Sequence, residues 1–119
     1  MSILFFTYMR DSPPYIPRTV HERQRAAFGH VLAVRLRADP ALLDRGRARI
    51  AQWMRDVASP TRSVAAWHAL CACRDLDGVL EALEAATEFA DEMRASHPFL
   101  GILSEADMIE IRRRVRSEP

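Results

Sequence analysis

Lysine and asparagine are absent from this sequence of 119 residues, which holds only four glycines and two cysteines. All 17 basic residues are therefore arginine. A GC-rich genome, whose codons favour arginine and alanine, explains that bias without any binding role, so arginine content alone is weak support for nucleic-acid recognition. The glycines are scattered, which excludes a glycine-rich phosphate-binding loop.

Long apolar runs are also missing. No stretch of 18 or more apolar residues occurs, so we expect no transmembrane helix. The apolar run Ile3–Met9 is short and follows no basic residue, which argues against a secretory signal and favours the cytoplasm. In that compartment the two cysteines, Cys71 and Cys73, are expected to be reduced thiols.

The length suits one domain with a modest hydrophobic core. We expect an all-α fold, a compact bundle of five or six short helices, preceded by an extended N-terminal arm. The arm, residues 1–18, is apolar and rich in proline, which disfavours regular structure. Residues 19–119 form the predicted helical domain.

Capping residues and prolines predict where each helix begins. The predicted helices span residues 19–37, 40–57, 60–73, 78–95 and 105–116. Their expected N-caps are Thr19, Asp39, Ser59, Asp77 and Ser104. A break near Thr87 would divide the fourth helix in two. Apolar residues at helical spacing are expected to face the core, among them Val34, Val57, Trp67 and Cys71.

Charge is distributed unevenly along the chain. Residues 1–75 carry 12 arginines against six acidic residues, a balance of +6. Residues 76–111 carry one arginine against nine acidic residues, a balance of −8, and residues 112–119 return to +3. Such an asymmetry can steer association with a charged partner, although it says nothing about the fold.

No catalytic or metal-binding pattern is complete. His68, Cys71 and Asp75 lie at helical spacings of three and four, but a structural zinc site needs a fourth ligand and no second cluster exists. We therefore expect Cys71 to be a small buried apolar residue. No serine lies in a nucleophile elbow, and no phosphate-binding glycine motif occurs. We expect no enzymatic activity, no cofactor and no bound metal.

Two surfaces are candidates for binding. The first combines the acidic residues of the fourth helix with the apolar segment around Pro98 and Gly101, residues that interrupt a helix. Its expected partner-binding residues are Glu84, Glu88, Asp91, Glu92, Phe99, Leu100 and Ile102. The residues alone leave open whether the apolar segment plugs the bundle or forms a docking surface.

The second candidate surface is basic. Arg45 and Arg49 lie about one helical turn apart in the second helix, and another group of arginines lies near the C-terminus. Either group would add a salt-dependent increment to affinity if it contacted phosphates. The candidate nucleic-acid-binding residues are Arg45, Arg47, Arg49, Arg112, Arg113 and Arg114. The alternative is a solvated surface that merely reflects codon usage.

Part of the chain resembles a group of small helical bacterial proteins. The segments are Arg37-Ala-Asp-Pro40, Arg47-Ala-Arg-Ile-Ala-Gln-Trp53, Trp67-His-Ala-Leu70 and Met93-Arg-Ala-Ser-His-Pro-Phe-Leu-Gly-Ile-Leu-Ser-Glu105. The last segment is similar to the pattern Arg-x-Ser-x-Pro-Phe-x-Gly-x-Leu-Ser near the C-terminus of such proteins. The resemblance covers about residues 31–112. These proteins resemble antitoxin-type components, encoded beside a toxin, so the resemblance implies a protein partner and no chemistry.

We therefore expect a non-enzymatic binding protein, an antitoxin-like component that neutralises a toxin-like protein partner. The alternative is an arginine-rich, nucleic-acid-binding transcriptional regulator that contacts DNA. No association with a membrane is expected, and self-association into a homo-oligomer is left open.

Overall fold

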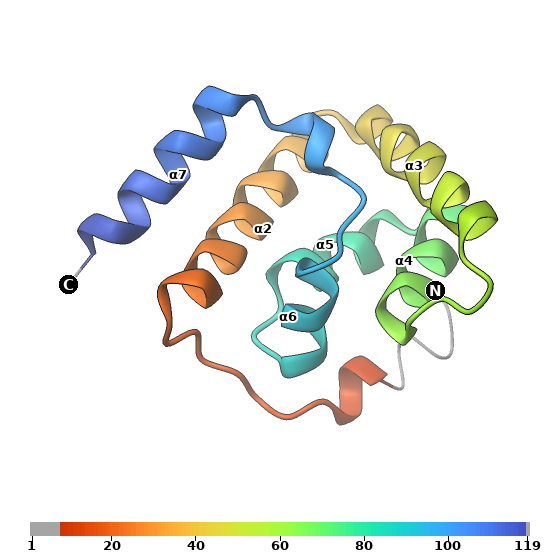
Figure 1. Ribbon diagram of the computed structural model, residues 1–119, viewed down its shortest axis with the longest axis horizontal. Helices are drawn as coiled ribbons and strands as arrows, with labels where there is room; N and C mark the ends of the chain where they lie inside the picture. Colours follow the sequence, from red (N-terminus) through yellow and green to blue (C-terminus); the bar gives the residue numbers. More distant parts are fainter. Residues whose placement is uncertain (1–7, 119) are drawn as a thin grey trace.

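All regular structure in the described part of the chain is helical. The computed structural model describes residues 8–118, among which no strand occurs (Figure 1). A helical turn over residues 8–11 precedes the named elements. These are α2 (Val20–Ala38), the 3-10 turn η1 (Pro40–Leu42), α3 (Leu43–Asp56), α4 (Arg62–Ala72), α5 (Leu76–Glu84), α6 (Glu88–Arg94), the 3-10 turn η2 (Leu100–Ile102) and α7 (Glu105–Ser117). The predicted all-α class is confirmed.

Helix α2 is the central element of the fold. It packs against α5, α6 and α7, while α3 packs against α4 on the other side of the molecule (Figure 1). With the turn over residues 8–11, the described residues form seven α-helical segments, slightly more than the five or six predicted. The additional segments come from that turn and from a division of the predicted fourth helix.

Two helix starts follow the predicted capping. Thr19 and Glu22 form a capping box at α2, and Ser104 and Asp107 form another at α7. In each box a hydroxyl and a carboxylate satisfy backbone N–H groups that the first turn leaves without partners. These contacts span three residues and depend on nothing outside the turn.

Three predicted caps were wrong. Helix α4 is capped by Thr61, whose hydroxyl accepts a hydrogen bond from the Val64 N–H at 3.3 Å. Ser59 lies two residues too early, because Pro60 precedes the helix instead of occupying its first turn. Asp39 stands before η1 and makes no side-chain cap bond.

Helix α5 also begins before its predicted cap. Asp75, not Asp77, accepts a hydrogen bond from the Gly78 N–H at 3.0 Å. The preceding residue, Arg74, has a φ of 52°, a left-handed conformation that reverses the chain directly after α4. The sharp turn sets Asp75 at the start of the next helix, so α5 includes Leu76.

The break near Thr87 is present and the N-terminal arm covers it. Thr87 caps α6, and residues 12–18 run extended beside the α5–α6 joint. The Tyr15 N–H donates to the Ala86 carbonyl at 3.0 Å, and the Glu88 N–H donates to the Pro13 carbonyl at 3.1 Å. These bonds satisfy backbone groups that an interrupted helix exposes. The predicted arm is therefore extended over residues 12–18 and helical over residues 8–11, while residues 1–7 lie outside the described chain.

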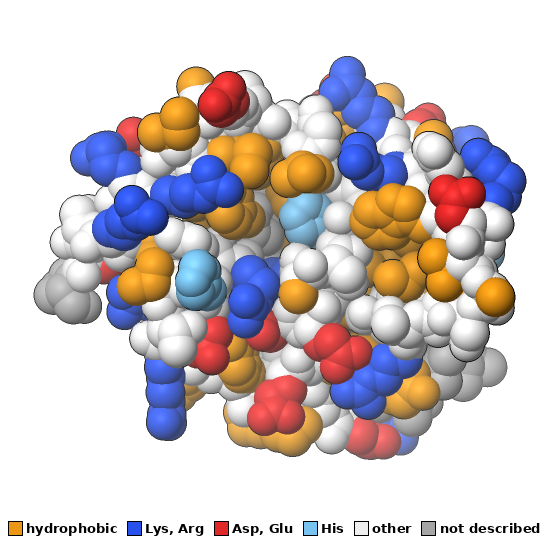
Figure 2. Space-filling model, in the orientation of Figure 1, with side chains coloured by type: hydrophobic (Ala, Val, Ile, Leu, Met, Phe, Trp, Pro, Cys, Tyr) orange, Lys and Arg blue, Asp and Glu red, His pale blue; other side chains and the backbone are white. Residues whose placement is uncertain are grey.

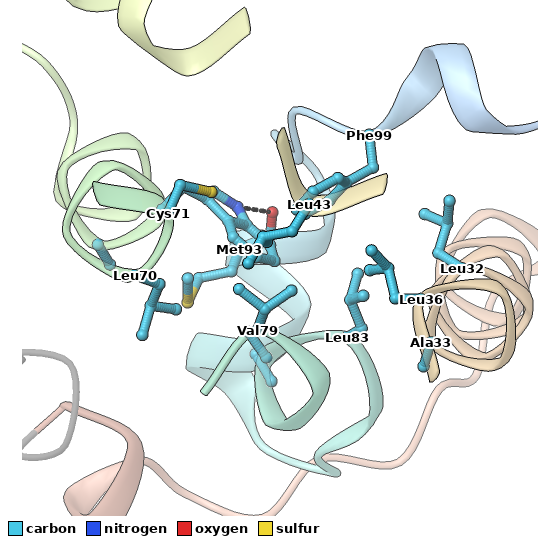
Figure 3. Packing of buried hydrophobic residues seen from close by; sticks show 14 of the residues in the cluster. Leu32, Ala33, Leu36, Leu43, Leu70, Cys71, Val79, Leu83, Met93 and Phe99 are labelled. Carbon is cyan, nitrogen blue, oxygen red and sulfur yellow. Dashed lines mark hydrogen bonds between the residues drawn. The ribbon is translucent and has the colours of Figure 1, made fainter. Parts of the chain in front are cut away.

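The core is formed where α2, α3, α4, α5 and α6 meet the segment before η2, with Ile111 of α7 at its edge (Figure 3). The Trp67 ring is fully buried and its indole N–H donates to the Met93 carbonyl at 2.7 Å. Phe99 is 1% exposed and meets Trp67 edge-on, with ring centroids 5.6 Å apart. Cys71 is buried, which confirms its predicted place in the core. Burial raises the pKa of its thiol to about 12, so the group stays protonated and unreactive at neutral pH.

Two residues predicted to face the core are exposed to solvent instead. Val34 is 49% exposed and Val57 is 45% exposed. In α2 the buried apolar side chains are those of Leu32, Ala33 and Leu36, and Val34 lies on another side of the helix. A helix with apolar residues on several sides has more than one face that could be buried. Only its packing against other helices decides which face is buried.

Candidate functional site

The acidic residues predicted to bind a partner are largely engaged within the molecule. Asp91 accepts two hydrogen bonds from Arg25 of α2, at 3.1 and 3.0 Å. Glu92 accepts two from Arg62 of α4, at 2.9 and 2.6 Å. Glu88 is exposed and has no ion pair with any residue in the range 8–118.

Glu84 is held in the same way. Its carboxylate contacts the guanidinium of Arg37 and lies 3.2 Å from His30 Nδ1, both on α2. Arg37 in particular holds the pKa of the Glu84 carboxyl below its usual range. Part of the charge of the basic first half and the acidic second half is therefore cancelled across the α2–α5, α2–α6 and α4–α6 contacts.

Charged side chains on one face follow this pattern. Over α6 and the N-terminal segment, acidic and basic side chains lie side by side, whereas basic side chains gather over α7 and α3 (Figure 2). Each exposed ion pair contributes little free energy to stability, about 0–1 kcal/mol. The ion pairs matter more for binding. An acidic face would have to break its bonds to these arginines before its carboxylates could contact a partner.

The apolar segment before α7 is divided between core and surface. Phe99 is buried against Trp67 and therefore plugs the bundle. Leu100 is 48% exposed and Ile102 is half-buried, both in η2. Phe99 therefore belongs to the core, whereas a docking role for Leu100 and Ile102 stays a prediction.

Arg45, Arg47 and Arg49 of α3 are exposed, unlike Arg25 of α2, which is partly buried against Asp91. None of Arg45, Arg47 and Arg49 forms an ion pair with a described residue. At about 100° per residue, Arg45 and Arg49 are about 40° apart around the helix, whereas Arg47 is about 160° from each. Burial raises the pKa of the Cys71 thiol and the charge of Arg47 opposes that shift, whereas burial and then the charge of Arg49 lower the pKa of His97. Only two of the three can share a contact surface.

The C-terminal arginines are also divided. Arg113 and Arg114 bind Glu110 within α7, at distances of 2.7–3.2 Å. Arg112 lies over the Phe28 ring of α2, 5.7 Å from its centroid, and has no carboxylate partner in the described chain. Arg112 is half-buried, and its charge is not paired with a described carboxylate.

The structure adds Ile109, a residue that sequence reasoning did not assign to a site. It is 57% exposed and lines a shallow concavity on α7 together with Arg112, Arg113 and Arg116. The sequence held a signal for this. Ile111 and Val115 are four residues apart and mark the face of α7 that is buried against α2, so an apolar residue on the other face, such as Ile109, is exposed. Ile109 lies about 160° from Ile111 around the helix.

No group of three or more His, Cys, Asp or Glu side chains within residues 8–118 is placed to hold a metal ion. The same part of the chain contains no helix with the length and apolar character needed to span a membrane. Comparisons with protein-family models, curated proteins and solved structures found no match. The resemblance to antitoxin-type proteins and the absence of enzymatic activity therefore stay predictions.

Proposed function

We propose that this chain is a non-enzymatic binding domain that recognises a protein partner through α7, as an antitoxin-like component would. The observation that supports the proposal is the exposure of Ile109 among Arg112, Arg113 and Arg116. Apolar side chains that anchor protein interfaces are commonly surrounded by a polar rim, in which arginine is enriched. An apolar residue in a ring of arginines fits an acidic protein surface with an apolar recess.

The position of α7 suits this role. Helix α7 packs mainly against α2, which leaves its outer face uncovered within the described chain. Arg112 and Arg116 have no carboxylate partner there and need release no internal bond before contacting an acidic group. The acidic face of α5 and α6 is less suitable, because Glu84, Asp91 and Glu92 already bind arginines.

The test is co-expression with the product of the adjacent gene, the expected partner of an antitoxin-like protein. We expect a stable complex and at least a tenfold loss of affinity in Ile109→Ser, because truncating a central apolar anchor costs about 1.4 kcal/mol or more. The matched control is Val57→Ser, which changes a similarly exposed apolar residue at the end of α3. Isothermal titration of both variants measures the difference. Absence of a complex, or equal weakening by the two variants, contradicts the proposal.

A second candidate function is nucleic-acid binding through Arg45 and Arg49. It is favoured by their shared side of α3 and their lack of ion pairs with described residues. If both contact phosphates, log affinity falls with log salt, and replacing both by glutamine reduces that slope by about 2.

The matched control for this second candidate is the double variant Arg113→Gln/Arg114→Gln, which removes two arginines already bound to Glu110. Gel-shift or fluorescence titrations at several salt concentrations give the slopes. Binding that does not depend on salt, or that both double variants weaken alike, eliminates this candidate.

A further inference from the structure

Two helices of this chain present outer faces of opposite charge with the same spacing of residues. The first, called the α7 face, lines a shallow hollow of about 510 Å³ and consists of Ile109, Arg112, Arg113, Arg116 and Ser117. The second, called the α5 face, lines a hollow of about 430 Å³ beside Arg37 of α2 and consists of Asp77, Leu80, Glu81, Glu84 and Ala85. Both sets occupy positions i, i+3, i+4, i+7 and i+8, which share one side of a helix.

Both faces point away from the core. The buried residues of α5 are Gly78, Val79, Ala82 and Leu83, and those of α7 are Ile111 and Val115. None of these belongs to either face. On the α7 face Ile109 is 57% exposed, and on the α5 face Asp77 and Glu81 are exposed while Leu80 is half-buried. Each face therefore combines an accessible apolar side chain with accessible charges.

Each face also keeps charges that its own chain does not use. On the α7 face Arg112 and Arg116 form no ion pair with a described residue. On the α5 face the same is true of Asp77 and Glu81. The other charged side chains of the two faces are bound within the chain. Two positive charges on one face and two negative charges on the other can thus pair without breaking an internal bond.

The two faces cannot meet within one molecule. Helix α2 lies between α5 and α7 and packs against both of them (Figure 1). A molecule that satisfies the α7 face must therefore bring the complementary face from outside. A second copy of this chain carries that face, with opposite charges at the same spacing around an apolar residue. Charge complementarity of this kind favours one docking arrangement over others and speeds encounter.

We propose that the chain associates with itself by docking the α7 face of one copy on the α5 face of a second copy. The unpaired arginines of the α7 face contact Asp77 and Glu81 of the second copy, and Ile109 packs against Leu80. The contact joins two different faces, so one intact face from each copy is enough to form it. A different protein that binds α7 would compete with this contact, but self-association does not depend on the existence of that protein.

The first measurement is sedimentation of the full chain alone at increasing concentration. We expect a Kd on the order of 100 μM at about 20 mM salt, because an interface two helical turns long is small and small interfaces bind weakly. Raising the salt to about 500 mM screens the exposed charges and should weaken the association about threefold or more. A chain that stays monomeric up to about 1 mM in low salt overturns the proposal.

The decisive measurement mixes two variants, each of which lacks one face. Ile109→Ser/Arg116→Gln removes the α7 face, and Asp77→Asn/Glu81→Gln removes the α5 face. All four residues are exposed, and Asp75 still caps α5, so both variants should fold. Alone, each variant should self-associate about tenfold more weakly than the natural chain, or less. Mixed in equal amounts they should associate again, because each supplies the face that the other lacks.

The control is Arg45→Gln/Arg49→Gln, which removes two unpaired arginines from α3 and touches neither face. Its self-association should match that of the natural chain. Equal weakening by this control would show that net charge, and not the two faces, drives association, which overturns the proposal. A mixture of the two face variants that stays monomeric also overturns it. Failure to bind the product of the adjacent gene has no bearing on these results, because the chain is measured alone.

Discussion

Replacing Phe99 by alanine is expected to lower the free energy of unfolding by about 3–5 kcal/mol. The ring is 1% exposed, meets Trp67 edge-on and lies parallel to the His97 ring, 6.5 Å away between centroids. Helix α3 approaches it so closely that a Cβ on Gly46 would lie 2.1 Å from its Cε1 atom. Removing the ring leaves a cavity that the surrounding rigid helices can fill only in part. Urea unfolding at neutral pH measures the loss.

The control for this variant is Leu100→Ala, one residue along the chain. Leu100 is 48% exposed, so its truncation should cost no more than about 0.5 kcal/mol. A domain of this size is stabilised by about 5–15 kcal/mol, so Phe99→Ala should remain measurable but weakly stable. Unchanged stability in Phe99→Ala, with a loss of partner binding, would show that Phe99 is an interface anchor and not part of the core.

The second large effect is a loss of stability as pH falls from about 6.5 to about 4. Burial, assisted by the positive charge of Arg49, lowers the pKa of His97 to about 4. Its Nδ1 accepts a hydrogen bond from the Phe99 N–H at 3.1 Å, which only the neutral ring can do. The unfolded chain binds this proton near pH 6.5 and the folded chain near pH 4. Protonation therefore favours the unfolded state in that window, by up to about 3 kcal/mol at its lower end.

The variant His97→Asn should remove this part of the pH dependence. Asparagine keeps an acceptor oxygen and has no titratable group. Carboxylates whose pKa values are lowered by arginine partners, such as Glu84 and Glu92, take up their protons only below the ordinary carboxyl range and so affect a lower window. Urea unfolding of both proteins at pH 7, 6 and 5 compares the slopes. If His97→Asn and the natural chain lose stability equally over this range, another group is responsible.

Helix placement was predictable because the signals that set it are local. Thr19 and Ser104 begin helices through hydrogen bonds to groups three residues away, and the sequence displays both partners. Two of the three caps that were wrong, Ser59 and Asp77, lie two residues from a residue of the same chemistry that caps instead. Which of two similar residues caps a helix depends on the backbone conformation, for example the left-handed φ of Arg74. The pattern of residues in the sequence does not show that conformation.

The binding surfaces were less predictable because charges far apart in sequence meet in the fold. Arg25 and Asp91 are 66 residues apart, and Arg37 and Glu84 are 47 apart. The composition of either half shows an unbalanced charge, and only the packing of α2 against α5 and α6 shows that much of it is cancelled. Among the arginines left without an ion pair to a described residue are Arg45, Arg47 and Arg49 of α3 and Arg112 and Arg116 of α7.

The sequence alone determined the helical class, most helix positions and the burial of Cys71, because caps, prolines and apolar spacing act within a few residues. It offered a break at Thr87 as one of two alternatives, and the structure has that break. The tertiary structure alone decided that Val34 faces solvent and that Phe99 fills the core. It also decided which carboxylates remain unpaired and which faces of α5 and α7 remain uncovered. These outcomes depend on how whole helices pack, and the free energy of that packing is spread over contacts between distant segments.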